Sequence, residues 1–510
     1  MSISNRVIKN TGFLYAKMGI TMFISLYTTR LVLNALGASD FGVFNVVGGA
    51  IAMLGFLHAA MSVATQRFMS FYEGKGEKHK QKQIFNVSLV LHFFIAIALG
   101  FILLIAGYFF FNGVLNIAPD RVYAAKVVYG SLIISTIFTV MSVPYEAVLN
   151  AHENMLYYSI VGVLESFLKL GVAFAVVYYM GDKLEIYGVL MACIPLIVLT
   201  IMRVYCHKKY AECVIAPKKY WNPILMKEMR SFAGWNLFST ASGMISQYGM
   251  GIVLNMFFGT VLNAAQGIAN QLSGQLMAFS NTMMKALNPV IAKSEGGGNR
   301  ELMLKATLLG SKFSFMLLAF FVVPFMIEAP YILNLWLKEI PDWAIVFTIL
   351  QLIRSLVEQL TIMLPRAISA QGDIKKFTMV KSVLNILPVI LTYICFRYNL
   401  PPYYLYIVWI VISSALGGGI SLYFTNKKCN LNYNDYFKKV LWPCLGLLFI
   451  MTVSGILVHS IWAPSFLKLV MVFSATTLSF LLSVYLIFLT FEEKILIDRL
   501  IINIKNRFYK

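Results

Sequence analysis

Charged residues are scarce in this sequence. Asp, Glu, Lys and Arg make up 13% of its 510 residues, whereas 59% are hydrophobic, and an ordinary soluble protein carries about 25% charged residues. The deficit comes from long apolar runs such as 88–111, 313–327 and 440–458. Because runs of roughly 20 apolar residues cross a bilayer as helices, the composition predicts an all-α polytopic membrane protein.

The sequence also lacks the motifs of enzymes and metal sites. Its six cysteines include no CxxC pair, so neither a disulfide framework nor a zinc site is supported. GxSxG, Walker A and HExxH motifs are absent, as is GxGxxG between a strand and a helix. The hydrophilic segments are short, which leaves little chain for a catalytic domain. We therefore expect no catalytic residues, no metal and no cofactor.

Negative charge is outweighed by positive charge, with a net charge of +20. In a membrane protein such an excess reports lysines held on the cytoplasmic side, so no nucleic-acid partner is expected. The basic residues of the loops fall in alternate segments, and the opposite set holds few: Arg121, Lys183, Lys338 and Arg397. This alternation predicts fourteen spans with both termini in the cytoplasm.

The predicted spans are separated by turn residues such as Gly37, Asn112-Gly113, Gly181-Asp182, Gly259, Gly372-Asp373 and Pro401-Pro402. They run over 10–33, 42–65, 84–111, 122–149, 156–179, 185–203, 231–257, 263–289, 307–329, 343–364, 377–396, 403–425, 440–460 and 466–491. The expected domains are an N-lobe (1–203), a cytoplasmic linker (204–230), a C-lobe (231–425), two further spans (426–491) and a basic cytoplasmic tail (492–510). The tail either lies on the inner leaflet as an amphipathic helix or is solvated.

One stretch of the sequence occurs twice. The segment 31–49, LVLNALGASDFGVFNVVGG, returns in altered form at 252–270 as IVLNMFFGTVLNAAQGIAN. The motif EGKG at 73–76 likewise corresponds to EGGG at 295–298. Six predicted spans separate the copies, and an even number means that both halves enter the membrane in the same direction. The repeat therefore predicts two six-helix lobes related by a pseudo-twofold axis along the membrane normal.

Basic residues outnumber acidic ones inside the predicted spans. A charge at bilayer depth costs at least roughly 2.5–3.5 kcal/mol, so such residues should face protein or water. Some lie near span ends and are expected to snorkel to the surface, namely Lys126, Lys285, Lys312, Lys381 and Lys468. Lys17 and Arg30, on the first span, have no acid three or four residues away. An anion ligand is the favoured interpretation of both, with outward snorkelling of Arg30 as the alternative.

Two deeper basic residues have an acid one helical turn away. The pairs are Glu165/Lys169 and Arg354/Glu358, both at i, i+4 spacing. A structural ion pair and a functional role remain equally open for both pairs. Glu165 and Glu358 are the deepest acids, so either could bind a coupling proton or sodium ion.

Polar residues follow one face of the eighth predicted span. Spacings of 3, 4 and 3 place Asn263, Gln266, Asn270 and Ser273 in line, and Gln247 and Asn255 are polar at depth on the seventh span. Hydrogen bonding between packed helices is one interpretation. The favoured one is a water-filled cavity, because the stripe lies in the second copy of the repeated stretch.

Three segments carry a resemblance to a known family: RLVLNALGASDFGVFNVVGG (30–49), ATQRFMSFYEGKG (64–76) and PYEAVLNAHEN (144–154). With the two lobes, the extra helix pair and the cationic spans, they resemble the multidrug/oligosaccharidyl-lipid/polysaccharide exporter superfamily. Within it the chain is most similar to the Wzx-type polysaccharide flippases. The resemblance implies a flippase in the bacterial inner membrane that moves an undecaprenyl-pyrophosphate-linked oligosaccharide by alternating access, such as an O-antigen, capsule or exopolysaccharide unit.

The implied partners are the lipid-linked oligosaccharide, membrane lipid, and either H⁺ or Na⁺, with contact to a polysaccharide polymerase or glycosyltransferases also open. The residues expected to bind pyrophosphate or glycan are Arg30, Lys17, Arg354, Gln247, Asn255, Gln266 and Asn270. The alternatives are a cation-coupled multidrug exporter, which the lack of Asp or Glu on the first span disfavours, and a lipid II flippase. A membrane polysaccharide polymerase is disfavoured by the repeat and the short loops.

Overall fold

The computed structural model describes residues 3–52, 55–114, 119–337, 340–490 and 493–494. Throughout these residues the regular secondary structure is helical. In this described part of the chain, eleven helices are long and apolar enough to cross a membrane, and they coincide with predicted spans 1, 3–6 and 9–14. The prediction of an all-α polytopic membrane protein is confirmed.

The chain divides into two compact units. The N-terminal unit comprises Asn10–Thr240 together with Ala292–Gly298. The C-terminal unit comprises Ala241–Ile291 and Asn299–Lys510, with Met1–Lys9 added to it. The expected linker 204–230 contains the end of one helix, a short helix and the start of another.

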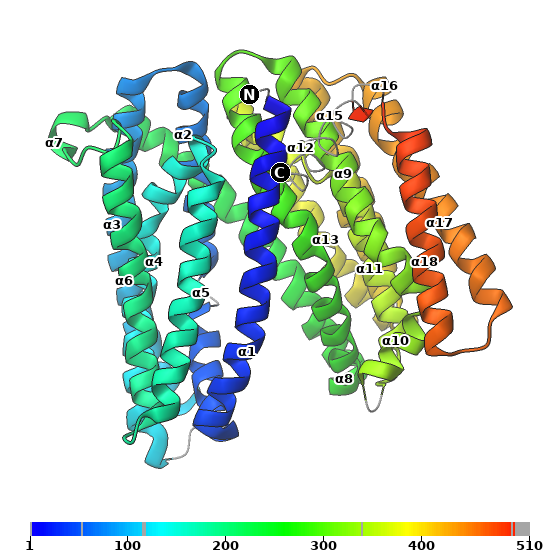
Figure 1. Ribbon diagram of the computed structural model, residues 1–510, viewed down its shortest axis with the longest axis horizontal. Helices are drawn as coiled ribbons and strands as arrows, with labels where there is room; N and C mark the ends of the chain where they lie inside the picture. Colours follow the sequence, from blue (N-terminus) through cyan, green and yellow to red (C-terminus); the bar gives the residue numbers. More distant parts are fainter. Residues whose placement is uncertain (1–2, 53–54, 115–118, 338–339, 491–492, 495–510) are drawn as a thin grey trace, which may run out of the picture. The chain divides into compact units, whose positions relative to one another are not determined.

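The N-terminal unit is built on four helices that lie side by side, α3 to α6 (Figure 1). Its helices in order are α1 (Ile3–Ala52), α2 (Gly55–Lys75), α3 (Lys78–Phe109), η1 (Phe110–Val114), η2 (Pro119–Arg121), α4 (Val122–Ala151), α5 (Met155–Tyr178), α6 (Lys183–Lys209) and α7 (Pro217–Tyr220). Asn154 and Asp182 cap α5 and α6 by accepting hydrogen bonds from backbone N–H groups of the first turn. These two caps mark where α5 and α6 begin, in the gaps that the sequence predicts between the spans.

Helix α1 contains the break predicted at Gly37. This glycine has φ 76° and ψ 166°, which lies outside the helical region and which only glycine adopts readily. The second predicted span, 42–65, therefore continues from the end of α1 into α2, with residues 53–54 outside the described part of the chain.

Helix α8 (Pro223–Gly296) begins and ends in the N-terminal unit, and its middle part, Ala241–Ile291, folds back on itself within the C-terminal unit. In a straight helix Gly251 and Gln266 would lie about 22 Å apart. Instead, a Cβ on Gly251 would come within 3.2 Å of the Gln266 Oε1. Leu254 and Ala265 also share one hydrophobic cluster. The chain must therefore reverse between these positions, as the predicted turn at Gly259 requires, and α8 holds the seventh and eighth predicted spans.

The C-terminal unit continues through α9 (Arg300–Ile327), α10 (Ala329–Trp336), α11 (Ala344–Thr361), α12 (Leu364–Gln371), α13 (Lys375–Arg397), α14 (Tyr404–Trp409), η3 (Ile410–Leu416), α15 (Gly417–Cys429), α16 (Tyr433–Tyr436), η4 (Phe437–Leu441), α17 (Trp442–Ile461), α18 (Phe466–Ser483) and η5 (Val484–Phe488). Helix α9 packs against both α11 and α17, and α18 lies beside α17 (Figure 1). Phe315, Leu352 and Leu447 belong to the core that these helices share. Residue 491 of the last predicted span and residues 492 and 495–510 of the predicted tail lie outside the described residues.

Three lysines that were predicted to snorkel are turned inward instead. Lys312 is 2% exposed, and its Nζ donates to the Phe488 carbonyl at 2.8 Å and to Glu493 Oε2 at 2.7 Å. Lys468 is 4% exposed and lies 3.4 Å from His459 Nε2. Lys381 donates to the Ser413 carbonyl at 3.0 Å. Each prediction was wrong because a neighbouring segment supplies the acceptor that snorkelling would otherwise seek in the headgroups. Lys126 and Lys285 are exposed, as expected.

Candidate functional site

A polar network surrounds Arg354 on α11 in the C-terminal unit. Its Nη1 donates to Glu358 Oε1 at 2.7 Å, and its Nε donates to Gln351 Oε1 at 3.1 Å. The guanidinium lies 4.0 Å from the centre of the Trp409 ring, within the range of a cation–π contact. The Arg354 side chain is 12% exposed and that of Glu358 is 26% exposed. The predicted i, i+4 ion pair is therefore present and largely withdrawn from solvent.

Glu358 is shared by a second cation. Ser414 Oγ donates to the same carboxylate oxygen at 3.2 Å. Lys381 on α13 also interacts electrostatically with Glu358. Arg354 and Lys381 therefore have one carboxylate between them, and this cluster carries a net charge of +1. An anion that reached it would meet two cations and one acid.

The polar stripe of α8 is partly paired with this network. Ser273 Oγ lies 2.8 Å from Ser355 Oγ and accepts from Gln351 Nε2 at 3.5 Å, so this end of the stripe bonds between helices. Asn263 Oδ1, Gln266 Nε2 and Asn270 Oδ1 are buried and have no hydrogen-bond partner among the described residues. Buried polar atoms are rarely left unpaired, so these three are available to water or to a polar ligand.

The structure describes only one of the two polar side chains that were expected at depth on the seventh predicted span. Gln247 is exposed on the surface of α8. Asn255 lies within α8, but its side chain is outside the described part of the structure.

In the N-terminal unit, Lys17 of α1 lies against α5. Its Nζ is 4.1 Å from the centre of the Tyr158 ring. A Cβ added at Gly162 would overlap the Lys17 side chain, so the glycine leaves room for the lysine stem. Glu146 of α4 and Glu165 of α5 both interact electrostatically with Tyr158. Lys17 has no acid on its own helix face, but folding brings it into a region that carries two.

Two further predicted residues belong to the N-terminal unit. Glu165 Oε1 accepts from Lys169 Nζ at 2.6 Å, and these side chains are 39% and 43% exposed. Arg30 lies in α1, and its side chain is outside the described part of the structure. Thirteen residues separate Arg30 from Lys17, which corresponds to about 20 Å along a helix.

Sequence reasoning missed several members of these clusters. Lys381, Trp409, Ser414 and Tyr158 come from helices other than the one that carries the residue they contact. Helical periodicity relates positions on one helix only. The one available signal was the polar pair Ser413-Ser414 in an otherwise apolar stretch.

A separate charged cluster lies outside the spans of the N-terminal unit. His152 Nδ1 is 3.4 Å from Glu73 Oε1, while its Nε2 contacts Glu212 Oε1. The three residues offer ligand atoms within 4.8 Å of one another. The two carboxylates, however, face opposite ring nitrogens, so the imidazole lies between them. This geometry favours polar contacts of the imidazole with both carboxylates over metal chelation, in which the carboxylates and one ring nitrogen would have to point at a single position.

The carboxylates of this cluster are held ionised. Burial opposes ionisation of Glu73, but hydrogen bonds from Gln81 and Lys78 and the charge of His152 outweigh it and lower its pKa. Burial likewise opposes ionisation of Glu212, and the hydrogen bond and charge of His152 lower its pKa in the same way. Tyr210 stacks on the imidazole at 4.2 Å and holds the ring in place.

No protein-family model matches the chain, and no curated protein matches it. Several solved structures do. One is an outward-facing multidrug resistance MATE family transporter of the MOP superfamily, with a TM-score of 0.71 and 17% identity over 84% of this chain and 96% of that one. Another is a MOP superfamily transporter from Pyrococcus furiosus, with a TM-score of 0.70 and 16% identity over the same shares. The latter is described as having a binding pocket of reverse polarity that suggests a different function.

These similarities define the class of fold. The chain has the fold of MATE transporters of the MOP superfamily over most of its length. At this level of identity they establish the fold alone.

Proposed function

We propose that the protein is a flippase that carries an undecaprenyl-pyrophosphate-linked oligosaccharide across the bacterial inner membrane by alternating access. The observation that carries the proposal is the shared carboxylate of the C-terminal unit, where Glu358 is the one carboxylate among the described residues that serves both Arg354 and Lys381. Positive charge that is not fully compensated at membrane depth is costly unless it serves an anion. A lipid-linked pyrophosphate supplies such an anion at that depth.

The chemistry of the cargo matches the two kinds of polar group in the C-terminal unit. An arginine can hold a phosphate through two parallel N–H bonds, whereas a lysine acts as a point charge. The buried, unpaired polar atoms of Asn263, Gln266 and Asn270 could bond the hydroxyl groups of a glycan. The isoprenoid tail needs no protein site because it is soluble in the surrounding lipid.

In the N-terminal unit, the spacing of Lys17 and Arg30 supports transfer of the pyrophosphate between them. About 20 Å along one helix is too far for one pyrophosphate to contact both residues. The pyrophosphate would therefore pass from one to the other as access alternates. Arg30 would make the tighter contact and Lys17 the looser one.

The direct test is transport in proteoliposomes that contain a labelled lipid-linked oligosaccharide. We expect Arg30→Ala to abolish flipping in a protein that still folds and inserts. Arg30→Lys should retain part of the activity, because the charge remains and only the forked geometry is lost. Lys285→Gln, at an exposed lysine of α8, is the matched control and should transport normally. Wild-type export of surface glycan by Arg30→Gln would contradict a pyrophosphate site at this residue.

A cation-coupled multidrug exporter is the second candidate. It is favoured by the fold shared with a multidrug resistance transporter and by acids at membrane depth, Glu165 and Glu358. In the same proteoliposomes, efflux of a lipophilic cationic dye driven by a proton or sodium gradient would favour this candidate. Flipping of lipid II in place of the oligosaccharide would favour the lipid II flippase. Glycan polymerisation without transport would indicate the polymerase.

The coupling of transport to an ion gradient has a separate test. If Glu165 or Glu358 binds the coupling ion, its replacement by Gln should uncouple transport from that ion gradient. Normal transport by Glu165→Gln and by Glu358→Gln under every ion gradient would show that neither residue couples and that both acids serve only as ion-pair partners.

A further inference from the structure

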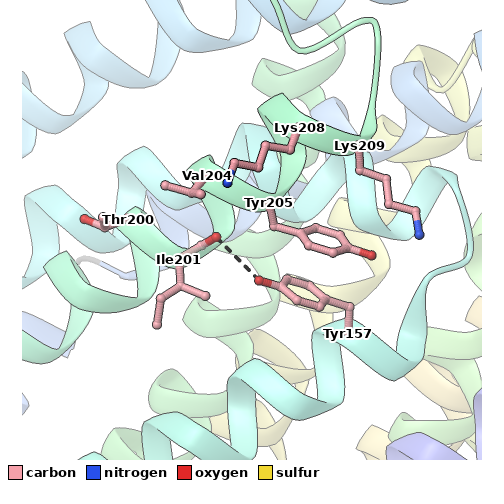
Figure 2. A pocket seen from close by; sticks show the side chains of 7 residues that line it. All are labelled: Tyr157, Thr200, Ile201, Val204, Tyr205, Lys208 and Lys209. Carbon is pink, nitrogen blue, oxygen red and sulfur yellow. Dashed lines mark hydrogen bonds between the residues drawn. The ribbon is translucent and has the colours of Figure 1, made fainter.

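A pocket of about 540 Å³ lies in the N-terminal unit between the start of α5 and the last turns of α6 (Figure 2). Its lining combines two tyrosines, two lysines, one threonine and two apolar side chains. The residues that matter to its chemistry are Tyr157, Ile201, Val204, Tyr205, Lys208 and Lys209.

The floor of the pocket is aromatic and fixed in place. The rings of Tyr157 and Tyr205 stack at 3.5 Å with an interplanar angle of 9°. The Tyr157 hydroxyl donates to the Ile201 carbonyl at 3.5 Å, as Figure 2 shows, and the Tyr205 hydroxyl accepts from Asn154 at 2.9 Å. A preformed floor reduces the entropy lost when a ligand binds.

The charges around this floor are all positive. Lys208 and Lys209 are exposed, and neither forms an ion pair with a carboxylate among the described residues. In Figure 2 their ammonium groups lie to either side of Tyr205. No acidic residue lines the pocket, so a monoanion would meet two cations and no opposing charge. Both lysines also stand in the last turn of α6, where they complement the helix dipole.

An apolar surface leads from the lysines along α6. Val204 is 49% exposed, and Ile197, two turns earlier on the same face, is 40% exposed. Lysines at the end of a span beside an exposed apolar surface mark the level of the lipid headgroups. The pocket therefore joins a headgroup region to an acyl-chain region.

We propose that this pocket is a binding site for an anionic phospholipid. The phosphate lies between Lys208 and Lys209 over the tyrosine floor, and an acyl chain follows Val204 toward Ile197. Basic pockets between membrane helices bind anionic headgroups in this manner. A pocket of about 630 Å³ on α18 offers a contrast, because its lining, which includes Phe466 and Leu478, has no charged side chain. That pocket should accept acyl chains without selecting a headgroup.

The test is equilibrium binding of short-chain phosphatidylglycerol and phosphatidylcholine to the delipidated full-length protein in detergent. At about 1 kcal/mol per lysine near the headgroup, Lys208→Gln/Lys209→Gln should bind phosphatidylglycerol about 30-fold more weakly. Lys218→Gln/Lys219→Gln removes the same charge from α7, outside the pocket, and should bind like the wild type. Equal affinity of the wild type and the first double variant would overturn the proposal.

A further experiment distinguishes a lipid headgroup from free phosphate as the ligand of this pocket. Val204→Trp fills the apolar side of the pocket and should weaken phosphatidylglycerol binding while leaving the lysines in place. Inorganic phosphate should bind far more weakly than the lipid, because it gains nothing from the apolar surface. If inorganic phosphate binds as tightly as phosphatidylglycerol and Val204→Trp has no effect, the pocket is an anion site and the lipid proposal is wrong. This inference does not depend on which cargo the protein transports.

Discussion

Two ion pairs with identical spacing in the sequence have different surroundings in the fold. Arg354 and Glu358 are 12% and 26% exposed, whereas Lys169 and Glu165 are 43% and 39% exposed. The first carboxylate also accepts from Ser414 and faces a second cation. An i, i+4 spacing in the sequence therefore fixes the partner but not the strength of the interaction.

This contrast predicts unequal costs for removing the two acids. Glu358→Gln removes the carboxylate that Arg354 and Lys381 share among the described residues, and we expect a loss of about 2 kcal/mol of folding free energy, less than for a fully buried pair. Glu165→Gln should cost less than about 1 kcal/mol, because its pair is more exposed. Thermal unfolding of both variants in one detergent measures the difference. Equal destabilisation would show that the exposed fractions do not govern these pairs.

The bridge at His152 predicts a dependence of stability on pH. The folded-state pKa values of Glu73 and Glu212 lie below their unfolded values. The stability that they contribute is therefore complete above the unfolded pKa of about 4.3 and is lost as pH falls through the lower folded values. Titration of these two groups should leave the midpoint temperature of thermal unfolding unchanged above about pH 5 and should lower that temperature below about pH 4.

Removing the bridge should move this transition. In His152→Ala, burial acts on Glu212 without the opposing hydrogen bond, so its pKa rises and stability is lost at higher pH. Glu77→Gln, at a carboxylate that is 38% exposed, is the control and should keep the wild-type profile. An unchanged profile in His152→Ala would mean that His152 does not hold these carboxylates ionised.

At the scale of elements, the repeated EGxG motif packs against its own copy inside the N-terminal unit. A Cβ at Gly74 would overlap the Lys293 carbonyl, and one at Gly296 would overlap the Phe71 carbonyl. Gly297 also lies close to Gly74, since its Cβ would come within 3.1 Å of the Gly74 oxygen. The two turns approach backbone to backbone, so glycine is required in both copies.

We therefore expect Gly74→Ala and Gly296→Ala each to cost about 2 kcal/mol or more, since the added methyl group must push two backbones apart. Gly130→Ala in α4 is the matched control, because a Cβ there has nothing within 4 Å. That variant should be neutral or stabilised by up to about 1 kcal/mol. Thermal unfolding of the three variants tests the contact, and neutrality of both Gly74→Ala and Gly296→Ala would refute it.

At the scale of the whole molecule, the alternation of basic loops predicts the orientation in the membrane. Single cysteines in a background without the native cysteines should report it. Asn399→Cys, in the exposed turn after α13, should react with an impermeant thiol reagent added outside. Lys78→Cys and Lys218→Cys should react only after the membrane is opened. Position 116, outside the described residues, should behave like 399. The reverse pattern would overturn the topology.

Local physics decided much of this protein from the sequence alone. Apolar runs specified the helices, and glycine and capping residues placed breaks such as those at Gly37 and Asp182. Spacing on a single helix predicted the pairs Arg354/Glu358 and Glu165/Lys169, because 3.6 residues per turn bring i and i+4 together.

Only the tertiary structure decided which helices face one another. Lys312 meets Glu493, 181 positions away, and Lys381 donates to the Ser413 carbonyl rather than to the headgroups. Lys17 lies over Tyr158 on a different helix. Such contacts depend on packing between distant segments, and helical periodicity holds no information about the partner helix. The sequence could therefore count the membrane charges, while the fold determined which of them remain without a full counter-charge.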